Sequence, residues 1–329
     1  MDIEHYPLEI QIPRTINSAS QFKITVLGSS GALPAYGRFP SAQLVEIQNR
    51  YFLIDCGEGT QMQLMRFQLS FHKINHIFIS HLHGDHYLGL TGLLFTMHLQ
   101  RRATKLHIYS QRGLEDILLL QLKYSRSVLN YRIIFHTIDP GEKKVIFEDQ
   151  VLIVETIPLV HKINCVGFLF REKPKPKKIN KEKLQEQMPV YGAGRLLQYI
   201  VELKAGADVF DESGNLLYKN EDFTLPAKPN YSFAYCSDTA YTENIVEQIR
   251  GVDLLYHEAT FMEDEKDKAT ETRHSTAAQA ARIANKAQVK RLLIGHFSAR
   301  YRELQPILEE ARSIFSETSL AIEGKTFEL

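Results

Sequence analysis

The stretch Ile77-Phe78-Ile79-Ser80-His81-Leu82-His83-Gly84-Asp85-His86 decides how the rest of the chain is interpreted. Its apolar beginning predicts a buried strand, and three histidines and one aspartate follow within six residues. His81 and His83 are two residues apart, so at a strand end their side chains point to the same side. Gly84 permits a sharp turn, and a helix is predicted over residues 87–99. These ligand types at this spacing indicate a site for one metal ion or a pair of ions, against the alternative of a polar surface loop.

Length and composition are those of a globular protein with a large core. The chain has 329 residues, of which 44% are hydrophobic and 24% are charged, enough for one large α/β domain or two smaller ones. The formal net charge is zero, so any affinity for nucleic acid has to come from a local patch. The three cysteines, Cys56, Cys165 and Cys236, are too few for a disulfide framework and favour a reducing cytoplasm. Met1–His5 does not resemble a signal peptide, and no apolar run reaches membrane length.

Predicted strands repeatedly end in metal-binding or acidic residues. The strands are expected at residues 22–28, 41–47, 51–55, 106–109, 133–137, 151–159, 165–170, 231–236, 252–256 and 290–294. Polar side chains at or just after their ends are Asp55, His161, Asp238, His257, Glu258 and His296. Helices are expected at residues 61–69, 114–123, 277–286 and 303–315, with Ser275 or Thr276 as a cap. The recurring order of strand, polar residue and helix predicts one sheet edge that carries metal-binding side chains.

Two of these residues leave alternatives open. His161 follows a strand end as His81 does, but a lone histidine is more often structural than a ligand. Asp55 lies in a glycine-bearing turn, Asp55–Gln61, whose spacing fits neither a P-loop nor a dinucleotide fingerprint. We interpret Asp55 as the acceptor that holds a metal-bound histidine by its other ring nitrogen, with a plain turn aspartate as the alternative.

The composition changes abruptly between residues 171 and about 229. Arg171–Lys178 is basic, contains two prolines and cannot form an interior strand or helix. A helical pattern over residues 181–188 and a second helix-like segment follow. This region is interpreted as an arm inserted into a single domain of residues 1–329. A solvated linker is the alternative, and contact with a phosphate backbone is favoured if the core processes nucleic acid.

Taken together, these motifs resemble the metallo-β-lactamase superfamily and, within it, the ribonuclease Z family of tRNA 3′-processing endonucleases. The resemblance runs from about residue 22 to the carboxyl terminus. It rests on the Asp55–Gln61 turn, the His81–His86 motif, His161, Ser237-Asp238-Thr239, His257-Glu258-Ala259-Thr260, His274-Ser275-Thr276 and Gly295–Tyr301. The first histidine motif specifies only the superfamily, whereas the later motifs and the inserted arm specify the tRNA-processing branch.

The resemblance implies the fold, the ligands and the reaction. The fold would be an α/β, βαβα sandwich with two divalent metal ions, most often zinc, at the sheet edge. One ion would be bound by His81, His83 and His161, the other by Asp85, His86 and His296, with Asp238 between them. Asp85 would also be the general base. The reaction would remove the 3′ trailer from precursor tRNA, leaving a 3′-hydroxyl on the tRNA and a 5′-phosphate on the trailer.

Further roles are assigned on weaker grounds. We choose His274 to protonate the leaving oxygen, on the argument that a helix N-terminus lowers a histidine's pKa, with a structural loop histidine as the alternative. His257 and Glu258 are expected to position His274 or a ligand. The six histidines outside any motif are expected to be structural or on the surface: His5, His72, His76, His98, His107 and His136.

The chain departs from the family pattern in two places. The loop Leu33–Pro40, which the family uses in its treatment of the terminal CCA, keeps Arg38 but lacks the lysine and asparagine that the family usually carries. Gly192-Ala193-Gly194 stands where the family has a Gly-Pro element near the tip of the arm. The family is usually homodimeric, with the arm of one subunit gripping the tRNA that the other cuts.

Two other functions are alternatives to precursor-tRNA cleavage. One is a phosphodiesterase of the same fold that acts on small diesters, although a small substrate needs no distant arm. The other is a catalytically idle RNA-binding relative, although every expected ligand, Asp85 included, is present.

Overall fold

Two seven-stranded sheets pack face to face in a computed structural model that describes residues 22–184, 186 and 198–329. The first sheet has the spatial order β18 (Thr326–Glu328), β1 (Phe22–Gly28), β2 (Ala42–Ile47), β3 (Arg50–Ile54), β4 (Ile74–Phe78), β5 (Leu106–Ser110) and β6 (Ile133–Thr137). The second has the order β17 (Thr318–Leu320), β16 (Leu292–Gly295), β15 (Leu254–Glu258), β14 (Ser232–Cys236), β9 (Cys165–Glu172), β8 (Leu152–Leu159) and β7 (Val145–Glu148).

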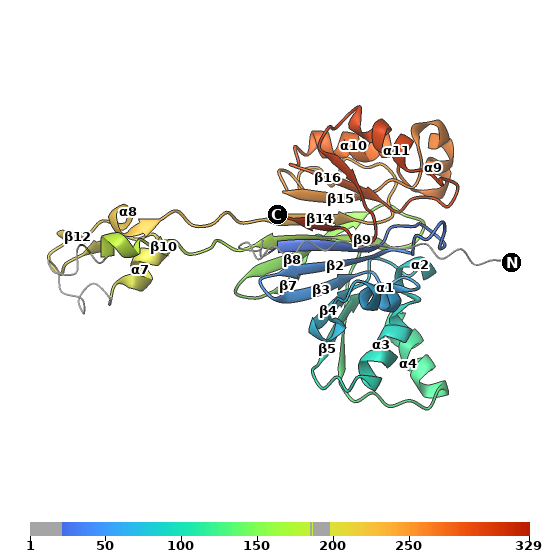
Figure 1. The fold of residues 1–329 in the computed structure, drawn as a ribbon, viewed down its shortest axis with the longest axis horizontal. Helices are drawn as coiled ribbons and strands as arrows, with labels where there is room; N and C mark the ends of the chain where they lie inside the picture. The colour runs from blue at the N-terminus through green and yellow to red at the C-terminus, as the bar shows by residue number, and fades with distance from the viewer. Residues whose placement is uncertain (1–21, 185, 187–197) are drawn as a thin grey trace.

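Helices cover the outer face of each sheet (Figure 1). On the first sheet lie α1 (Thr60–Arg66), α2 (Gly84–Tyr87), α3 (Leu90–Leu99) and α4 (Leu114–Tyr124). On the second lie α10 (Ala277–Lys286) and α11 (Gln305–Arg312), with α9 (Lys266–Thr272) beside them. Two short 3₁₀ turns are η1 (Phe71–Lys73) and η2 (Glu263–Glu265). The layers run helix, sheet, sheet, helix, which confirms the predicted α/β sandwich built from two β-then-α halves.

The core between the sheets is aromatic. Phe52 and Phe78 of the first sheet meet Phe170 of the second at ring-centroid distances of 5.5 and 5.8 Å, and all three side chains are fully buried. Each such side chain stabilises the fold by about 1.5–3 kcal/mol through burial alone. A large buried cluster on each outer face attaches the helices. The sandwich is therefore a rigid support for loops at its edges.

Strand direction brings the important loops to one edge. β3 to β6 are parallel in the first sheet, and β14 to β17 are parallel in the second. β8 runs antiparallel to β9, which runs antiparallel to β14, so β8 and β14 end at the same edge. The segments that follow β4, β8, β14 and β16 therefore meet at this edge.

Local residues form the turn between β2 and β3 and the predicted cap of α10. β2 and β3 are joined by Gln48-Asn49, which both have positive φ, as a two-residue type I′ turn requires. Thr276 caps α10 with a reciprocal pair of hydrogen bonds. Its side chain accepts a hydrogen bond from Gln279 N, and the Gln279 side chain accepts one from Thr276 N.

The helix predicted over residues 87–99 is confirmed from Leu90 onward, but its first residues are separated from it by a break. α2 ends at Tyr87 and α3 begins at Leu90, with Gly89 between them. Gly89 N donates to Cys56 O at 2.9 Å, and a Cβ on Gly89 would lie 2.0 Å from Gly57 O. The close approach of the Cys56-Gly57 turn breaks the helix. No pattern in the sequence around Gly89 predicts this contact.

Other boundaries also differ from the predictions. β4 ends at Phe78, since Ser80 N turns away to Asp55 Oδ1, so His81 and His83 lie in a loop and not at a strand end. Elements of the sandwich that the sequence did not predict include β7, α9, β17 and β18. The last of these returns the carboxyl terminus to β1 in the first sheet.

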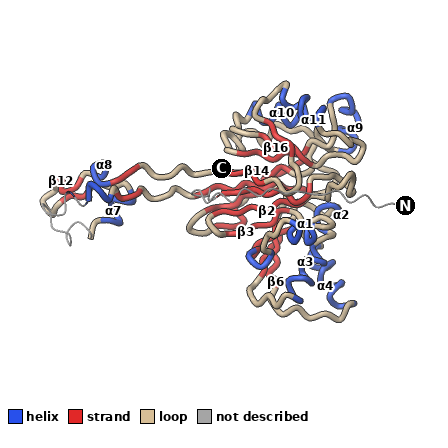
Figure 2. Tube along the Cα trace, in the orientation of Figure 1, coloured by secondary structure: helices blue, strands red, loops and turns tan. Residues whose placement is uncertain are grey.

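The chain between β9 and β14 leaves the sandwich as a stalk that carries a small folded head (Figure 2). The head contains β10 (Lys178–Ile179), α7 (Ile200–Ala205), β11 (Val209–Phe210), β12 (Leu216–Tyr218), α8 (Asn220–Phe223) and β13 (Thr224–Leu225). It has its own core of Leu203, Val209, Tyr218 and Phe223. The linker alternative is wrong, because a linker buries no core of its own. Residues 181–184 are helical as predicted, whereas Gly192-Ala193-Gly194 lies outside the described residues.

Glu172 holds the root of the stalk. Its buried carboxylate accepts from Gln48 Nε2 at 2.8 Å, from Tyr231 N at 2.9 Å and from Lys175 Nζ at 2.5 Å. These bonds join the outgoing and returning segments to the sandwich at the point where they leave it.

Candidate metal centre

His81, His83, His161 and Asp238 form the first group of potential ligands. His83 Nδ1 lies 3.0 Å from His81 Nε2 and 3.2 Å from His161 Nε2. Asp238 Oδ2 faces the same nitrogens, 3.5 Å from His81 Nε2 and 3.7 Å from His161 Nε2. Four donor atoms that converge at these distances suit one metal ion.

Asp85, His86 and His296 form the second group. Asp85 Oδ2 lies 3.4 Å from His86 Nε2 and 3.3 Å from His296 Nε2. Asp238 Oδ1 faces both rings, 3.4 Å from His86 Nε2 and 3.2 Å from His296 Nε2. Asp238 therefore has one oxygen toward each group, and the seven side chains named in the sequence analysis come together at one sheet edge.

The donor set fits a metal cation. His86 Nε2 is buried and has no hydrogen-bond partner among the described residues, although it points between two carboxylates. Burial lowers the pKa values of His81, His83 and His161, so these rings favour the neutral form that binds metals. An unpartnered buried nitrogen and neutral imidazoles are what a site for a divalent ion requires.

Asp55 holds the ring of His86 through a hydrogen bond. Its Oδ2 accepts from His86 Nδ1 and Tyr235 OH, both at 2.8 Å, and its Oδ1 accepts from Ser80 N at 2.8 Å. The expected bond between Asp55 and a histidine of the candidate metal centre is present, and the plain turn aspartate is wrong. Such a bond directs the other ring nitrogen, Nε2 of His86, toward the metal position.

The sequence did not identify several other groups that hold the ligand rings. Ser80 Oγ bonds Asp55 Oδ2 at 2.9 Å and lies 3.1 Å from His81 Nδ1. His161 Nδ1 lies 2.9 Å from Arg273 O, and His296 Nδ1 lies 2.9 Å from Thr260 Oγ1. Hydroxyls and backbone carbonyls carry no pattern that would single them out, apart from the position of Ser80 directly before His81.

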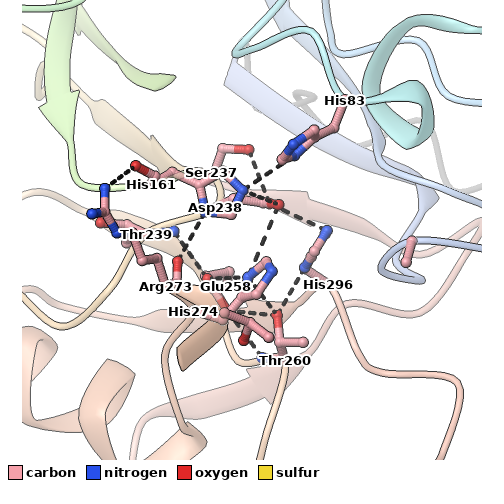
Figure 3. Close-up of polar contacts among 12 residues, drawn as sticks. His83, His161, Ser237, Asp238, Thr239, Glu258, Thr260, Arg273, His274 and His296 are labelled. Carbon is pink, nitrogen blue, oxygen red and sulfur yellow. Dashed lines mark hydrogen bonds and ion pairs between the residues drawn. The ribbon is translucent and has the colours of Figure 1, made fainter. Parts of the chain in front are cut away.

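Glu258 joins His274 to the centre (Figure 3). Its fully buried carboxylate accepts from His274 Nδ1 at 2.8 Å through Oε1, and Thr260 Oγ1 bonds Oε2 at 2.6 Å. Burial alone would lower the pKa of His274, but the charge of Glu258, its hydrogen bond and the charge of Asp238 together raise it to about 9. The expectation that Glu258 positions His274 is confirmed, whereas the expected lowering of the His274 pKa by a helix end is wrong.

His257 does not share this role. Its buried Nδ1 lies 2.7 Å from the backbone carbonyl oxygen of Glu258, and no contact with His274 or a ligand joins it within the described part of the chain. Three of the histidines expected to be structural form a stack on neighbouring strands, with His107 5.0 Å from His76 and 5.2 Å from His136 between ring centroids. His5 lies outside the described residues.

The chain aligns with curated ribonuclease Z proteins along nearly its whole length. It is 48% identical over 306 residues to ribonuclease Z of Cytophaga hutchinsonii, covering 93% of this chain and 96% of that protein. It is 46% identical over 305 residues to ribonuclease Z of Bacteroides fragilis strain YCH46, covering 92% and 98%. The chain belongs to the ribonuclease Z family.

Structural and family-model matches agree with this assignment. The crystal structure of the short form of human tRNase Z superposes with a TM-score of 0.67 at 27% identity, covering 93% of this chain and 98% of that one. A beta-lactamase superfamily domain model matches residues 223–297, and a model described as anti-Pycsar protein Apyc1 matches residues 22–174. Membership of the ribonuclease Z family places the two ligand groups in a metallo-β-lactamase fold.

Hydrogen bonds hold the loop Leu33–Pro40, in which the chain departs from the family pattern, against a second loop. The side chain of Arg38 is buried and donates from Nη2 to Tyr301 O at 2.7 Å. Ala32, with φ of 64°, donates its N–H to Asp85 Oδ2 at 2.8 Å. The residue directly before the loop therefore contacts the centre through its backbone, and the retained Arg38 links the loop to the segment of Tyr301.

Proposed function

We propose that this ribonuclease Z removes the 3′ trailer from precursor tRNA with the help of two divalent metal ions, most often zinc. The observation that carries the proposal is Asp238, whose two oxygens face two separate groups of ligands. His81, His83 and His161 would hold one ion, and Asp85, His86 and His296 the other. Bound in this way, two ions would activate water and stabilise charge on the phosphate.

Two side chains are proposed to move protons. All contacts that Asp85 makes with described residues involve Oδ2, which leaves Oδ1 to take a proton from the attacking water. His274 is held at Nδ1 by Glu258, so Nε2 is the atom turned to substrate. The carboxylate of Glu258 raises the pKa of His274, which favours the protonated ring that can donate to the leaving 3′-oxygen.

The arm of residues 171–229 is proposed to bind the body of the tRNA. Seven of its eleven lysines and arginines lie within residues 171–183, whereas its nine acidic residues are spread along it. Six lysines line a hollow of about 590 Å³ where the stalk meets the head: Lys175, Lys177, Lys178, Lys181, Lys204 and Lys228. A phosphate backbone is the partner that such a concentration of ammonium groups suits.

We also propose that the protein works as a homodimer. β9 begins beside the metal centre, where Cys165 Sγ lies 3.6 Å from His81 Nδ1, and ends at Glu172 at the root of the arm. The arm thus leads away from the centre of its own chain (Figure 1), so it can serve the centre of a second chain. Exposed apolar side chains on and beside the helices of the first sheet suit the contact between chains: Met62, Met65, Leu88, Leu99, Leu119 and Leu120.

The state of the three cysteines agrees with activity in the cytoplasm. Cys56, Cys165 and Cys236 are all free and buried, as in a reducing compartment. Over the described residues, the structure contains no helix both long and apolar enough to cross a membrane.

One paired assay tests the proposal against the two alternatives. The protein, with and without its arm, is given a 3′-extended precursor tRNA and a chromogenic phosphodiester. Deletion of the arm is expected to abolish precursor cleavage and to spare the small diester. Cleavage of the small diester by an intact protein that ignored the precursor would favour the phosphodiesterase.

A second variant addresses catalysis. Asp85→Ala is expected to silence both reactions while tRNA binding survives. Unchanged turnover in this variant would exclude the role given to Asp85, and binding without any cleavage by the unaltered protein would favour the idle relative.

A further inference from the structure

The hydroxyl of Ser80 lies between ligands of both candidate metal positions. Ser80 is fully buried just after β4, and its Oγ lies 3.1 Å from His81 Nδ1 and 2.9 Å from Asp55 Oδ2. The same oxygen of Asp55 accepts from His86 Nδ1 at 2.8 Å. His81 belongs to the first group of ligands and His86 to the second. Asp55 therefore reaches a ring of the second group directly and a ring of the first group through Ser80.

The backbone of Ser80 is held independently of its hydroxyl. Its N–H donates to Asp55 Oδ1 at 2.8 Å. Its carbonyl oxygen accepts from Val166 N at 3.0 Å and from Gln111 Nε2 at 2.6 Å. Because these bonds involve only the main chain of Ser80, removal of the hydroxyl should leave the backbone before His81 in place.

The number of protons fixes the direction of the hydrogen bonds around Ser80. A carboxylate only accepts, so the proton between Ser80 Oγ and Asp55 Oδ2 is that of the hydroxyl. Serine has no second side-chain proton, so the contact with His81 is a hydrogen bond only if Nδ1 of the ring donates. A neutral imidazole with its proton on Nδ1 has a free lone pair on Nε2. His81 Nε2 is the atom that faces the first group, 3.0 Å from His83 Nδ1 and 3.5 Å from Asp238 Oδ2.

A second side chain approaches the same nitrogen of His81. Cys165 Sγ lies 3.6 Å from His81 Nδ1 and is also buried. Sulfur is a weak acceptor, whereas a hydroxyl oxygen offers two full lone pairs. Ser80 is therefore the better partner for the ring, and Cys165 offers a comparison at the same atom.

We propose that Ser80 is a positioning residue that connects Asp55 to His81 and so supports the first metal position. The assignment rests on the proposed function, which requires an ion in each group. With Nδ1 held by Ser80, the His81 ring keeps the tautomer and the orientation that bind a metal. Asp55 then supports both positions, the second directly and the first through Ser80.

Metal binding measured separately at the two positions tests this role. The whole protein is loaded with cadmium, and the NMR signal of each bound ion is followed while nitrilotriacetate is added. Loss of one signal in His161→Ala identifies the first position. In Ser80→Ala, affinity at the first position is expected to fall about 10-fold to 100-fold. Affinity at the second position should stay, because the bond between Asp55 and His86 remains.

Cys165→Ala is the matched control, since it removes the other side chain beside His81 Nδ1. It should leave the affinity at both positions unchanged. A loss at the first position as large as that of Ser80→Ala would give the thiol an equal part and overturn the proposal. Equal losses at the two positions in Ser80→Ala, or no loss at either, would overturn it as well.

A double variant tests the connection between Asp55 and His81. Asp55→Asn alone is expected to weaken both positions, whereas Asp55→Asn added to Ser80→Ala should cause a further loss only at the second. A further loss at the first position would show that Asp55 acts on His81 by another route. A protein that met these expectations but did not cleave precursor tRNA would contradict the proposed function and leave the role of Ser80 standing.

Discussion

The ion pair of Glu258 and His274 makes the pH dependence of the reaction testable at the scale of one residue. Glu258→Gln removes the charge that, with Asp238, holds the pKa of His274 at about 9, and burial of the ring then pulls this pKa down. A general acid acts while protonated, so the alkaline limb of the pH profile should lie at a lower pH in the variant than in the unaltered protein. The pH profile of precursor cleavage under single-turnover conditions measures this shift.

A control distinguishes a changed pKa of His274 from damage to the metal centre. The metal content of Glu258→Gln should match that of the unaltered protein at neutral pH. An alkaline limb that did not move, with metal content intact, would exclude His274 as the acid.

Asp55 offers a second residue-scale prediction, because another aspartate repeats its local bonds. Asp55 accepts from Ser80 N and Oγ at 2.8 and 2.9 Å, and Asp253 accepts from Ser232 N and Oγ at the same distances. Asp55 also orients His86, so Asp55→Asn should weaken metal binding about 10-fold to 100-fold. Competition with a chelator, followed by elemental analysis, measures the affinity.

Asp253→Asn is the matched control, since Asp253 lies at the other end of β14 from Asp238. It should lower the free energy of unfolding without changing the affinity for metal. Equal losses of affinity in the two variants would contradict the role given to Asp55.

At this scale the sequence predicts ligands better than it predicts their supports. His81, His83, His86 and Asp85 crowd into a few residues whose types have few other reasons to occur together. The pKa of His274 was predicted in the wrong direction, because the expected effect of a helix end left out the charge of Glu258, which bonds the ring at 2.8 Å from the end of β15.

At the scale of elements, the junction between α2 and α3 is set by one backbone contact. Gly89→Ala would place a Cβ 2.0 Å from Gly57 O, and backbone cannot move aside as a side chain does. We expect a loss of about 2–3 kcal/mol in the free energy of unfolding. Because α2 carries Asp85 and His86, metal affinity should fall as well. Chemical denaturation and metal analysis measure the two effects.

Gly92→Ala tests whether this cost is specific to the junction. Gly92 lies inside α3, where a Cβ would meet only the end of the Gln61 side chain at 2.9 Å. Alanine also favours a helix interior by about 0.5–1 kcal/mol over glycine, so stability should be nearly unchanged or higher. A loss as large as that of Gly89→Ala would refute the explanation by backbone contact.

The same junction shows why some elements could not be predicted. The β2–β3 hairpin and the Thr276 cap follow from residues within a few positions of each other. The break at Gly89 depends on Gly57, which is distant in sequence, and β18 exists only because β1 offers an edge. Local patterns predict local elements, and contacts between distant segments decide the rest.

For the whole molecule, the stalk and the metal centre lie at opposite ends of β9. Val166 N, near the start of β9, donates to Ser80 O at 3.0 Å, while Arg171, near its end, pairs with Ser232 at the root of the arm. In the proposed dimer, a precursor bound by one arm would therefore be carried away from the centre of the same chain. The composition could indicate an inserted segment, whereas the direction of β9 supports the proposal that the arm serves a second chain.

Two inactive variants should therefore restore each other when mixed. Residues 174–229 can be replaced by a short turn, because β9 and β14 are antiparallel neighbours where the arm leaves. In a mixed dimer with Asp85→Ala, the intact centre of the armless chain faces the arm of the other chain. With random exchange of subunits, precursor cleavage should recover to about one quarter of the unaltered activity, since half of the dimers are mixed and each has one competent centre. Cleavage is measured after unfolding and refolding the two proteins together, with each refolded alone as the control. If the mixture stayed inactive although mixed dimers formed, each arm would have to serve its own centre.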